Sequence, residues 1–450
     1  MEGPSSGLRN EEQNLKTELT NMLQAVVLPE CPALEQCIHK APRVFRESNP
    51  QVYTPVIVSI GPFHKENSAL KPMEELKLQY LKAFLGRTTL CVDDFVVKLE
   101  ELENKIRSCY AEPINYGSND FLKMILIDAG FIIEHFLRFY EGNWFQTDPL
   151  LSENRWLAHN DLLRDFILLE NQLPYFVLED IYNLTGMNLQ FGSFLEITFR
   201  YFRFMNVRKI NFRTVYPKHF LDLLRIFQLP PIRSTSDLEA LKESHHVNHH
   251  YSASQLLDAG LKFTVHPTGY SELEYREGEL LMAPIYVSEF LVTFYWNTVA
   301  YESCHEELHS IISQYIRMVE FLIPTLKDVN ILRDKKIVAN WVGDNDAVLK
   351  LFTNLGSCIS KPHFHSMNFS ICKSLNDFYE NPCNQYKATL RRDYFNTPWK
   401  ITSTTAATVL LLLTLIQAVY VSFATSPKKS FLSTSPSTSD VDVHLCKEFR

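Results

Sequence analysis

Glycine is scarce in this chain, and the motifs that bind nucleotides are missing. Only 14 of the 450 residues are glycine, and neither G-x-G-x-x-G nor G-x-x-x-x-G-K-[ST] occurs. Such motifs place backbone N–H groups around a phosphate. The formal net charge of −8 and the pI near 6.0 also argue against a nucleic-acid-binding surface. We therefore expect no nucleic-acid partner and no cofactor.

Paired cysteines are missing as well. The nine cysteines are odd in number and scattered, and no C-x-x-C pair is present among them. Zinc modules and thioredoxin-like redox sites usually carry such pairs. We interpret most of the cysteines as reduced thiols packed in a hydrophobic core.

Charged residues are absent from a long stretch near the C-terminus. Residues 401–427 carry no charge, and Val409–Ala424 contains ten Val, Leu, Ile or Phe residues. Each contributes roughly −0.3 to −0.6 kcal/mol to insertion into a bilayer, or about −3 to −6 kcal/mol together. We predict a transmembrane helix over residues 399–424 and a disordered, Ser- and Thr-rich tail over 425–450.

The sequence also bears on the orientation of this helix. The first 13 residues are polar and lack the apolar core of a signal peptide, so late insertion through the C-terminal helix is expected. A modest excess of cations on the N-terminal side of the span favours a cytosolic domain, with the plasma membrane as the expected location. These cations are Lys387, Arg391, Arg392 and Lys400, against Lys428 and Lys429 on the other side. The glycosylation sequons at Asn183 and Asn368 favour the opposite orientation.

The residues before the span are numerous enough for one large domain or two of ordinary size. Residues 1–30 resemble a flexible arm, and residues 31–395 are predicted to form the globular domain. Within it we expect a helical half to about residue 230, a polar His-rich linker over 231–250 and an α+β half over 251–395. The predicted fold class is mainly α with a small β element.

Hydrophobic periodicity predicts the individual elements. Residues 53–63 favour a buried strand or extended segment, and 261–265 a strand that could pair as a hairpin with 279–287. Pro174 should end or kink the helix that contains it. The predicted helices cover residues 73–84, 94–109, 120–139, 160–184, 193–204, 217–227, 253–257, 289–302, 306–326 and 346–355.

One segment matches a metal-binding motif. His305-Glu-Glu-Leu-His309 fits H-E-x-x-H, in which two histidines one helical turn apart bind zinc and Glu306 would activate water. Glu307 is unusual at its position, and a third ligand such as Glu320 would have to lie nearby. The alternative, which we favour, is a helix N-terminus whose acidic residues stabilise the dipole and whose histidines face solvent.

Two further clusters of polar residues could have a function. His245, His246, His249 and His250 could form two metal-binding pairs on a helix, but a solvated cluster in a polar loop is the favoured interpretation. Glu170-Asn171-Gln172 interrupts an apolar stretch, and each group would cost roughly 1–3 kcal/mol if buried without partners. We expect these three to bond backbone groups freed by Pro174, with a ligand contact as the alternative. No catalytic, cofactor or metal residue is assigned.

Four phrases together resemble one family: YTPVIVSIGPFH at Tyr53–His64, MEELKLQYL at Met73–Leu81, DFILLENQLPYFVL at Asp165–Leu178 and SASQLLDAGLKF at Ser252–Phe263. With VANWV at 338–342, they are similar to the plant domain-of-unknown-function 247 family. The resemblance covers roughly residues 41–400. It implies a plant membrane protein of mostly helical fold, without agreed enzymatic residues, some of whose relatives are implicated in grass self-incompatibility.

These observations lead to two functional hypotheses. The first is a membrane-anchored, non-enzymatic recognition or signalling protein that binds another protein, with self-incompatibility between pollen and stigma as one setting. The second is a membrane-tethered zinc-dependent hydrolase that uses His305, Glu306 and His309. The sequence identifies neither the protein partner nor the oligomeric state.

Overall fold

The computed structural model describes residues 36–142, 155–231, 239–241, 243–247, 250–267, 271–305, 310–341, 343–359, 363–395 and 397–424. The chain divides into two compact units, with the boundary between Gln385 and Tyr386. The predicted N-terminal arm and C-terminal tail lie outside the described residues. Helices dominate the described part and short strands accompany them, which confirms the predicted α+β class.

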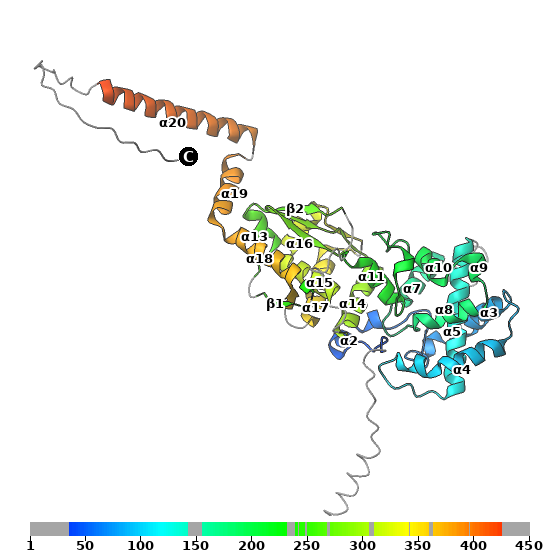
Figure 1. Cartoon of the computed structure of the whole chain (residues 1–450). Helices are drawn as coiled ribbons and strands as arrows, with labels where there is room; N and C mark the ends of the chain where they lie inside the picture. Colours follow the sequence, from blue (N-terminus) through cyan, green and yellow to red (C-terminus); the bar gives the residue numbers. More distant parts are fainter. Residues whose placement is uncertain are drawn as a thin grey trace, which may run out of the picture. The chain divides into compact units, whose positions relative to one another are not determined.

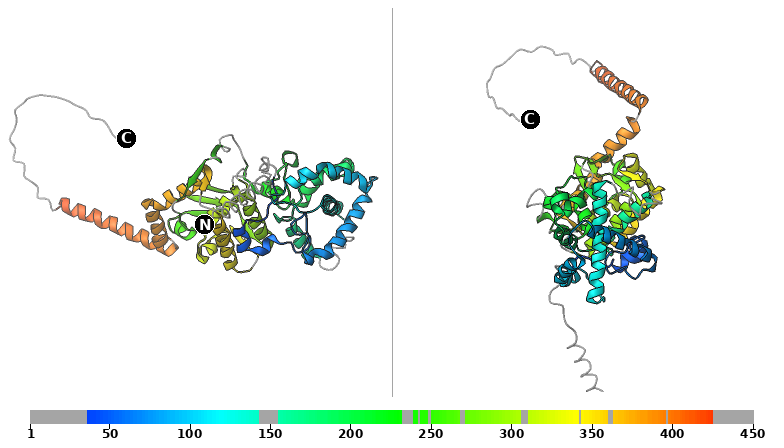
Figure 2. Two further views of the ribbon diagram at one scale, coloured as in Figure 1. Left: turned by 90° about the horizontal axis from the view of Figure 1, so that it is seen from below. Right: turned by 90° about the vertical axis from the view of Figure 1, so that its right-hand side faces the viewer.

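Helices form both ends of the first unit (Figures 1 and 2). Those of its N-terminal half are α2 (Arg43–Ser48), α3 (Lys71–Leu85), α4 (Val92–Ser108), α5 (Ser118–Glu141), α7 (Arg155–Asp165), α8 (Tyr175–Leu184), α9 (Asn188–Phe191), α10 (Phe194–Tyr201) and α11 (Phe220–Gln228). Those that follow are α13 (Ala253–Asp258), α14 (Glu289–Ser303), α15 (Ile311–Leu322), α16 (Leu326–Asp334), α17 (Asn345–Cys358) and α18 (Ser366–Glu380). Helix α19 (Pro382–Tyr394) crosses the boundary between the units.

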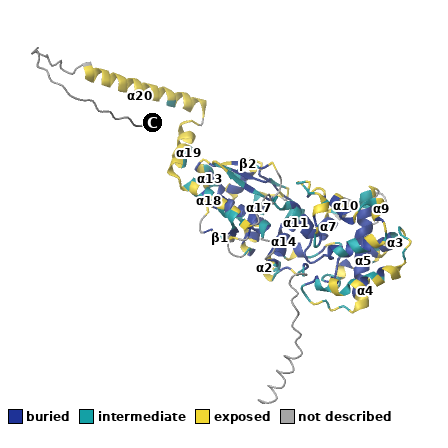
Figure 3. Cartoon of the chain, viewed as in Figure 1, coloured by how far each residue is buried: buried dark blue, intermediate teal, exposed yellow. Residues whose placement is uncertain are grey.

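Helix α5 is the centre of the N-terminal half (Figure 3). Nearly all of its side chains between Phe121 and Leu137 are buried, and the helix ends at Gly142, whose φ of 77° fits a left-handed cap. Gly130 lets α3 approach closely, because a Cβ there would lie 2.5 Å from the Cδ1 atom of Leu81. The two helices therefore pack almost backbone to backbone.

The strands form three small sheets in the described part of the chain. Strand β4 (Glu279–Met282) pairs in parallel with β2 (Lys262–Val265) and antiparallel with β3 (Leu273–Arg276). The expected hairpin between residues 261–265 and 279–287 is therefore wrong, because β3 forms the hairpin with β4 instead. Elsewhere β5 (Ile285–Val287) pairs in parallel with β6 (Val338–Asn340), and β1 (Ser244–His246) pairs antiparallel with β7 (His363–His365).

The helix expected over residues 160–184 is wrong in its middle. Helix α7 ends at Asp165, nine residues of turns and extended chain follow, and α8 begins directly after Pro174. The buried position of this region is nevertheless as expected, since Leu168 and Leu169 are fully buried. Their side chains lie in the core without belonging to a helix.

Helix α20 (Pro398–Ala424) belongs to the second unit and is exposed along its length (Figure 3). Its residues 398–423 contain an 18-residue window with a mean hydropathy of 2.1 and suffice in length and composition to cross a membrane. The single helix predicted at the C-terminus is therefore present.

Candidate functional site

A cleft of about 800 Å3 opens in the first unit. It is lined by the C-terminal part of α7, the segment after α10, strand β5, the start of α14 and the residue that follows β6. The two halves of the unit, which are distant in sequence, thus contribute to the same cavity. A concave site of this size is within the range that ligand pockets and peptide-binding grooves occupy.

The pairing of β5 with β6 places two aromatic side chains at this cleft. Tyr286 lies opposite Ala339 in the parallel register, and the Trp341 N–H donates to the Val287 carbonyl at 2.9 Å. The Tyr286 and Trp341 rings are 5.6 Å apart, and their residues are 44% and 72% exposed. Two large aromatic rings so exposed beside a cavity are typical of a binding surface.

A second aromatic pair lines the same cleft. Phe204 follows α10 and is half exposed, and its ring lies 5.4 Å from that of Phe290 in the first turn of α14. Each half of the unit therefore contributes an aromatic side chain to this contact. The cleft presents π faces from four elements to whatever occupies it.

Two carboxylates add charge to the cleft. Asp161 on α7 lines it together with Glu289 at the start of α14. Burial raises the pKa of Asp161, Arg164 opposes that shift, and the nearby negative charge of Glu289 adds to it. Neither carboxylate forms an ion pair with a described residue. A cation between them would relieve their mutual repulsion.

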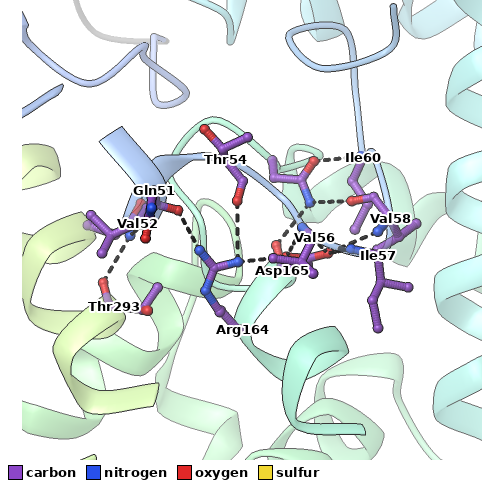
Figure 4. Close-up of polar contacts among 12 residues, drawn as sticks. Gln51, Val52, Thr54, Val56, Ile57, Val58, Ile60, Arg164, Asp165 and Thr293 are labelled. Carbon is purple, nitrogen blue, oxygen red and sulfur yellow. Dashed lines mark hydrogen bonds and ion pairs between the residues drawn. The ribbon is translucent and has the colours of Figure 1, made fainter. Parts of the chain in front are cut away.

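Arg164, which also lines the cleft, is held in place by hydrogen bonds to backbone carbonyls. Its guanidinium donates to the Gln51 and Thr54 carbonyls and lies 3.4 Å from Asp165 (Figure 4). The N–H groups of this guanidinium are therefore bound to backbone carbonyls beside the cleft. Arg203, an exposed residue on the segment after α10, is the other cation of the lining.

Asp165, next to Arg164 at the end of α7, binds three successive residues of the N-terminal part of the domain. Its carboxylate accepts hydrogen bonds from the backbone N–H groups of Val56, Ile57 and Val58 at 2.7 to 3.1 Å (Figure 4). Burial raises the pKa of Asp165 to about 6, and the three N–H donors oppose that shift. The apolar run at 53–63, predicted as a strand or extended segment, forms no strand: bends lie at 54, 56 and 57, and these bends let three successive N–H groups reach one carboxylate.

Asn171 completes the support of this segment. Its Oδ1 accepts from the Ile60 N–H at 2.7 Å, and its Nδ2 donates to the Val58 and Asp165 carbonyls at 3.0 Å each. The amide thus joins the segment to the end of α7. Every one of these contacts is buried and internal, which favours the structural interpretation of this residue over a ligand contact.

Gln172 satisfies backbone groups in the same turn. Its Nε2 donates to the carbonyls of Phe166 and Leu168 at 2.6 and 2.8 Å, and its Oε1 accepts from the Phe220 N–H at 3.0 Å. The expected bonding to backbone groups is present, but the expected cause is wrong. The groups are freed by the end of α7, and not by Pro174.

Glu170 binds the N-terminal part of the domain. Its carboxylate accepts from the Ala41 N–H at 2.7 Å, forms an ion pair with Arg46 and lies 3.4 Å from the His64 ring. Burial opposes its ionisation, but the bonds from His64 and Arg46 outweigh it and hold the pKa of Glu170 below its usual value. This carboxylate is therefore an anchor for the chain around α2.

The zinc motif is only partly within the described residues. Glu306, Glu307 and His309 lie outside them, whereas His305 follows α14 and is buried, which contradicts the solvent-facing interpretation for this histidine. Its Nε2 lies 3.0 Å from the Nε2 of His39, and burial lowers its pKa to about 4. Glu320, the suggested third ligand, is paired with Arg317.

No group of three potential metal ligands occurs anywhere in the described ranges. Of the histidine cluster, His245 and His246 lie in strand β1 and not in a polar loop, and His249 falls outside the described residues. The His245 ring stacks on Phe369 at 4.7 Å, and the His250 ring stacks on Phe321 at 3.7 Å. Both rings therefore pack against aromatic side chains.

The aromatic cleft was not predicted from the sequence. Tyr286, Phe290 and Trp341 lie on three segments that come together only through the pairing of β5 with β6 and the position of α14. A tryptophan directly after a short apolar strand is the one local signal that could have indicated an exposed aromatic. The sequence of that strand does not show which partner strand it pairs with.

The chain thus combines a mostly helical globular unit with one long apolar helix that follows it in the sequence. A family model described as "DUF247: Plant protein of unknown function" matches residues 38–413, and the chain belongs to this family. UPF0481 protein At3g47200 of Arabidopsis thaliana is 28% identical over 427 residues, which cover 88% of each chain. Putative UPF0481 protein At3g02645 of the same plant is 22% identical, covering 84% of this chain and 89% of its own. No solved structure matches significantly.

Proposed function

We propose that this plant protein is a membrane-anchored recognition protein, without enzymatic activity, that binds a segment of another protein in the aromatic cleft. The observation that carries the proposal is the exposed Tyr286–Trp341 pair at a cavity of about 800 Å3. Exposed aromatic residues of this kind dominate the energy of protein interfaces. Signalling across the membrane, including self-incompatibility, is one role that such binding would serve.

The chemistry of the cleft favours a partner segment with a cationic side chain. Asp161 and Glu289 supply negative charge without an ion pair in the described chain, and Tyr286 and Trp341 supply two π faces. Lysine or arginine binds favourably to both kinds of group. The positive charge of Arg164 acts on Asp161, but the guanidinium N–H groups of Arg164 are bound to the Gln51 and Thr54 carbonyls, and no ion pair joins Arg164 to Asp161 in the described chain.

We propose further that α20 anchors the protein in the plasma membrane with the first unit in the cytosol. The excess of cations on the N-terminal side of the span supports this orientation. The structure adds one consideration on the other side. Asn183 of the first sequon is exposed at the end of α8, so its modification would be sterically feasible if the domain were translocated.

A photo-crosslinker tests the recognition proposal in plant membranes. A benzophenone side chain at position 341 should give a protein adduct, and the same side chain at the exposed Tyr386, outside the cleft, should give much less. Replacing both Asp161 and Glu289 by the matching amides should weaken the adduct at position 341. Equal labelling at the two positions, or labelling by small metabolites only, would refute the proposal.

A metal assay separates this proposal from the hydrolase hypothesis. Purified protein should contain well under one equivalent of zinc. About one equivalent of zinc, lost on His309→Ala, would instead favour a metal-dependent enzyme, since an H-E-x-x-H site needs both histidines.

A further inference from the structure

Two cysteines lie side by side although 71 residues separate them in the sequence. Ile38 and Tyr110 form a parallel β-bridge, and Cys37 and Cys109 directly precede them. The N–H groups of Cys37 and Ile38 both donate to the Cys109 carbonyl at 2.9 Å. The bridge and these two hydrogen bonds hold the backbone of Cys37 against that of Cys109 at the C-terminal end of α4, and a disulfide requires such close backbones.

The two side chains are buried neighbours. The Cys109 thiol acts directly on the Cys37 thiol and also donates to the Lys105 carbonyl at 3.3 Å, and the residues are only 3% and 6% exposed. The other described cysteines lack such a neighbour: Cys358, for example, has the Ser48 hydroxyl at 3.3 Å as its contact. This pair is thus distinct from the remaining buried thiols.

The pair borders a cavity through which a small reagent could reach it. Cys37 and Cys109 both line a hollow of about 350 Å3, and Lys105 and Lys218 line it too. The neighbouring Cys109 thiol and burial raise the pKa of Cys37 well above its usual value, and the positive charge of Lys218 opposes this only in part. The two lysines outnumber the single carboxylate of the lining, Glu179, and would attract an anionic disulfide such as glutathione disulfide.

We propose that Cys37 and Cys109 form a reversible intramolecular disulfide that links the N-terminal segment of the domain to the end of α4. One thiolate attacks glutathione disulfide, forms a mixed disulfide and releases one glutathione thiolate. The second cysteine, after loss of its proton, attacks the protein sulfur of the mixed disulfide and releases the second glutathione. The two protein thiols are oxidised, and one glutathione disulfide is reduced to two glutathione molecules.

The linked segment is a junction of the domain. The carbonyl of Cys37 lies 2.9 Å from the Nε2 of His219, the residue that caps α11. Oxidation would therefore fix α4, the N-terminal segment and α11 relative to one another. Because the closed loop is long, the disulfide should stabilise the folded domain against unfolding.

The test uses the full-length protein in detergent, equilibrated in buffers of varied glutathione to glutathione disulfide ratio. Free thiols are blocked, disulfides are reduced, and the released thiols are labelled with a second reagent and mapped by mass spectrometry. As the fraction of glutathione disulfide rises, labelling of Cys37 and Cys109 by the second reagent should increase together, by about tenfold and with one shared midpoint. Cys358 and Cys372 should stay reactive to the blocking reagent after unfolding. Oxidation should also raise the urea midpoint of the wild-type protein but not of Cys37→Ser.

Several outcomes would overturn the proposal. Independent midpoints for Cys37 and Cys109, stable glutathione adducts on either one, or a disulfide that includes Cys31 would each show that the pair does not link internally. The mapping is performed on wild-type protein, so the result does not depend on whether a serine variant folds. It is also independent of the cleft, since Trp341→Ala should leave the shared midpoint unchanged.

Discussion

Removing the Asp165 carboxylate should be among the most destabilising single changes in the domain. Asp165→Ala leaves three backbone N–H groups, at Val56, Ile57 and Val58, without their acceptor. A hydrogen bond to a charged group contributes about 1.5–3 kcal/mol, and the exposed position of Val56 lets water replace part of the loss. We therefore expect the free energy of unfolding to fall by about 3–6 kcal/mol.

Urea unfolding of the full-length protein in detergent, followed by tryptophan fluorescence, measures this loss. Asp165→Asn keeps the shape and one acceptor oxygen, so its cost should be smaller, about 1–3 kcal/mol. Asp334→Ala is the control, because that carboxylate is 72% exposed at the end of α16, and its removal should change stability by less than about 0.5 kcal/mol.

Amide hydrogen exchange adds a local measurement. In Asp165→Ala the amides of Val56, Ile57 and Val58 should exchange faster than in the wild type, whereas amides in α17 should change little under native conditions. A loss below about 1 kcal/mol with unchanged exchange at the three amides would refute the reasoning, because this segment would then be held by other contacts.

The remaining predictions concern the core, pH and orientation. Leu169→Ala should cost about 2–5 kcal/mol in chemical unfolding, because the side chain is fully buried, while Leu189→Ala at a 93% exposed site should cost almost nothing; similar values for the two would refute the packing. Burial lowers the pKa of His219 to about 3, so the unfolded chain binds a proton below pH 6.5 that the folded chain does not. Between pH 7 and pH 5 the wild type should therefore lose about 2 kcal/mol relative to His219→Asn, which retains a cap for α11, and a constant difference would contradict the assignment. Glycosidase treatment of the protein from plant membranes should leave its mobility unchanged, and a shift abolished by Asn183→Gln would place the domain outside the cytosol.

Helices with a clear 3.6-residue pattern could be predicted from the sequence alone. The expected helices at residues 94–109, 120–139 and 289–302 correspond to α4, α5 and α14 within a few residues. Helices α4 and α5 have an apolar face that their own sequences display, whereas α14 is buried on all sides over residues 293–302. A cap residue marks an end of two of the three. Ser288 caps α14, and Gly142 ends α5.

The parts that could not be predicted depend on distant partners. Residues 166–174 are apolar enough to form a buried helix. Asn171 and Gln172, however, bond the carbonyls at the end of α7, and the helix stops there. Strand β2 pairs in parallel with β4, and an intervening strand that periodicity did not reveal makes the hairpin. The aromatic cleft depends on the same kind of pairing between β5 and β6, whose residues are about 50 positions apart.

The dependence of residues 37–61 on later parts of the chain also bears on how the protein is synthesised. Asp165 binds Val56 across 109 positions, and the Asn297 side chain donates to the Val52 carbonyl across 245. Closing loops of this length carries an entropic cost that must be met before the contacts stabilise anything. On the ribosome the N–H of Val56 consequently stays without its acceptor until α7 has emerged, and the Val52 carbonyl stays without its donor until α14 has emerged. A chaperone that holds nascent chains would find this early apolar segment only partly covered until late in translation.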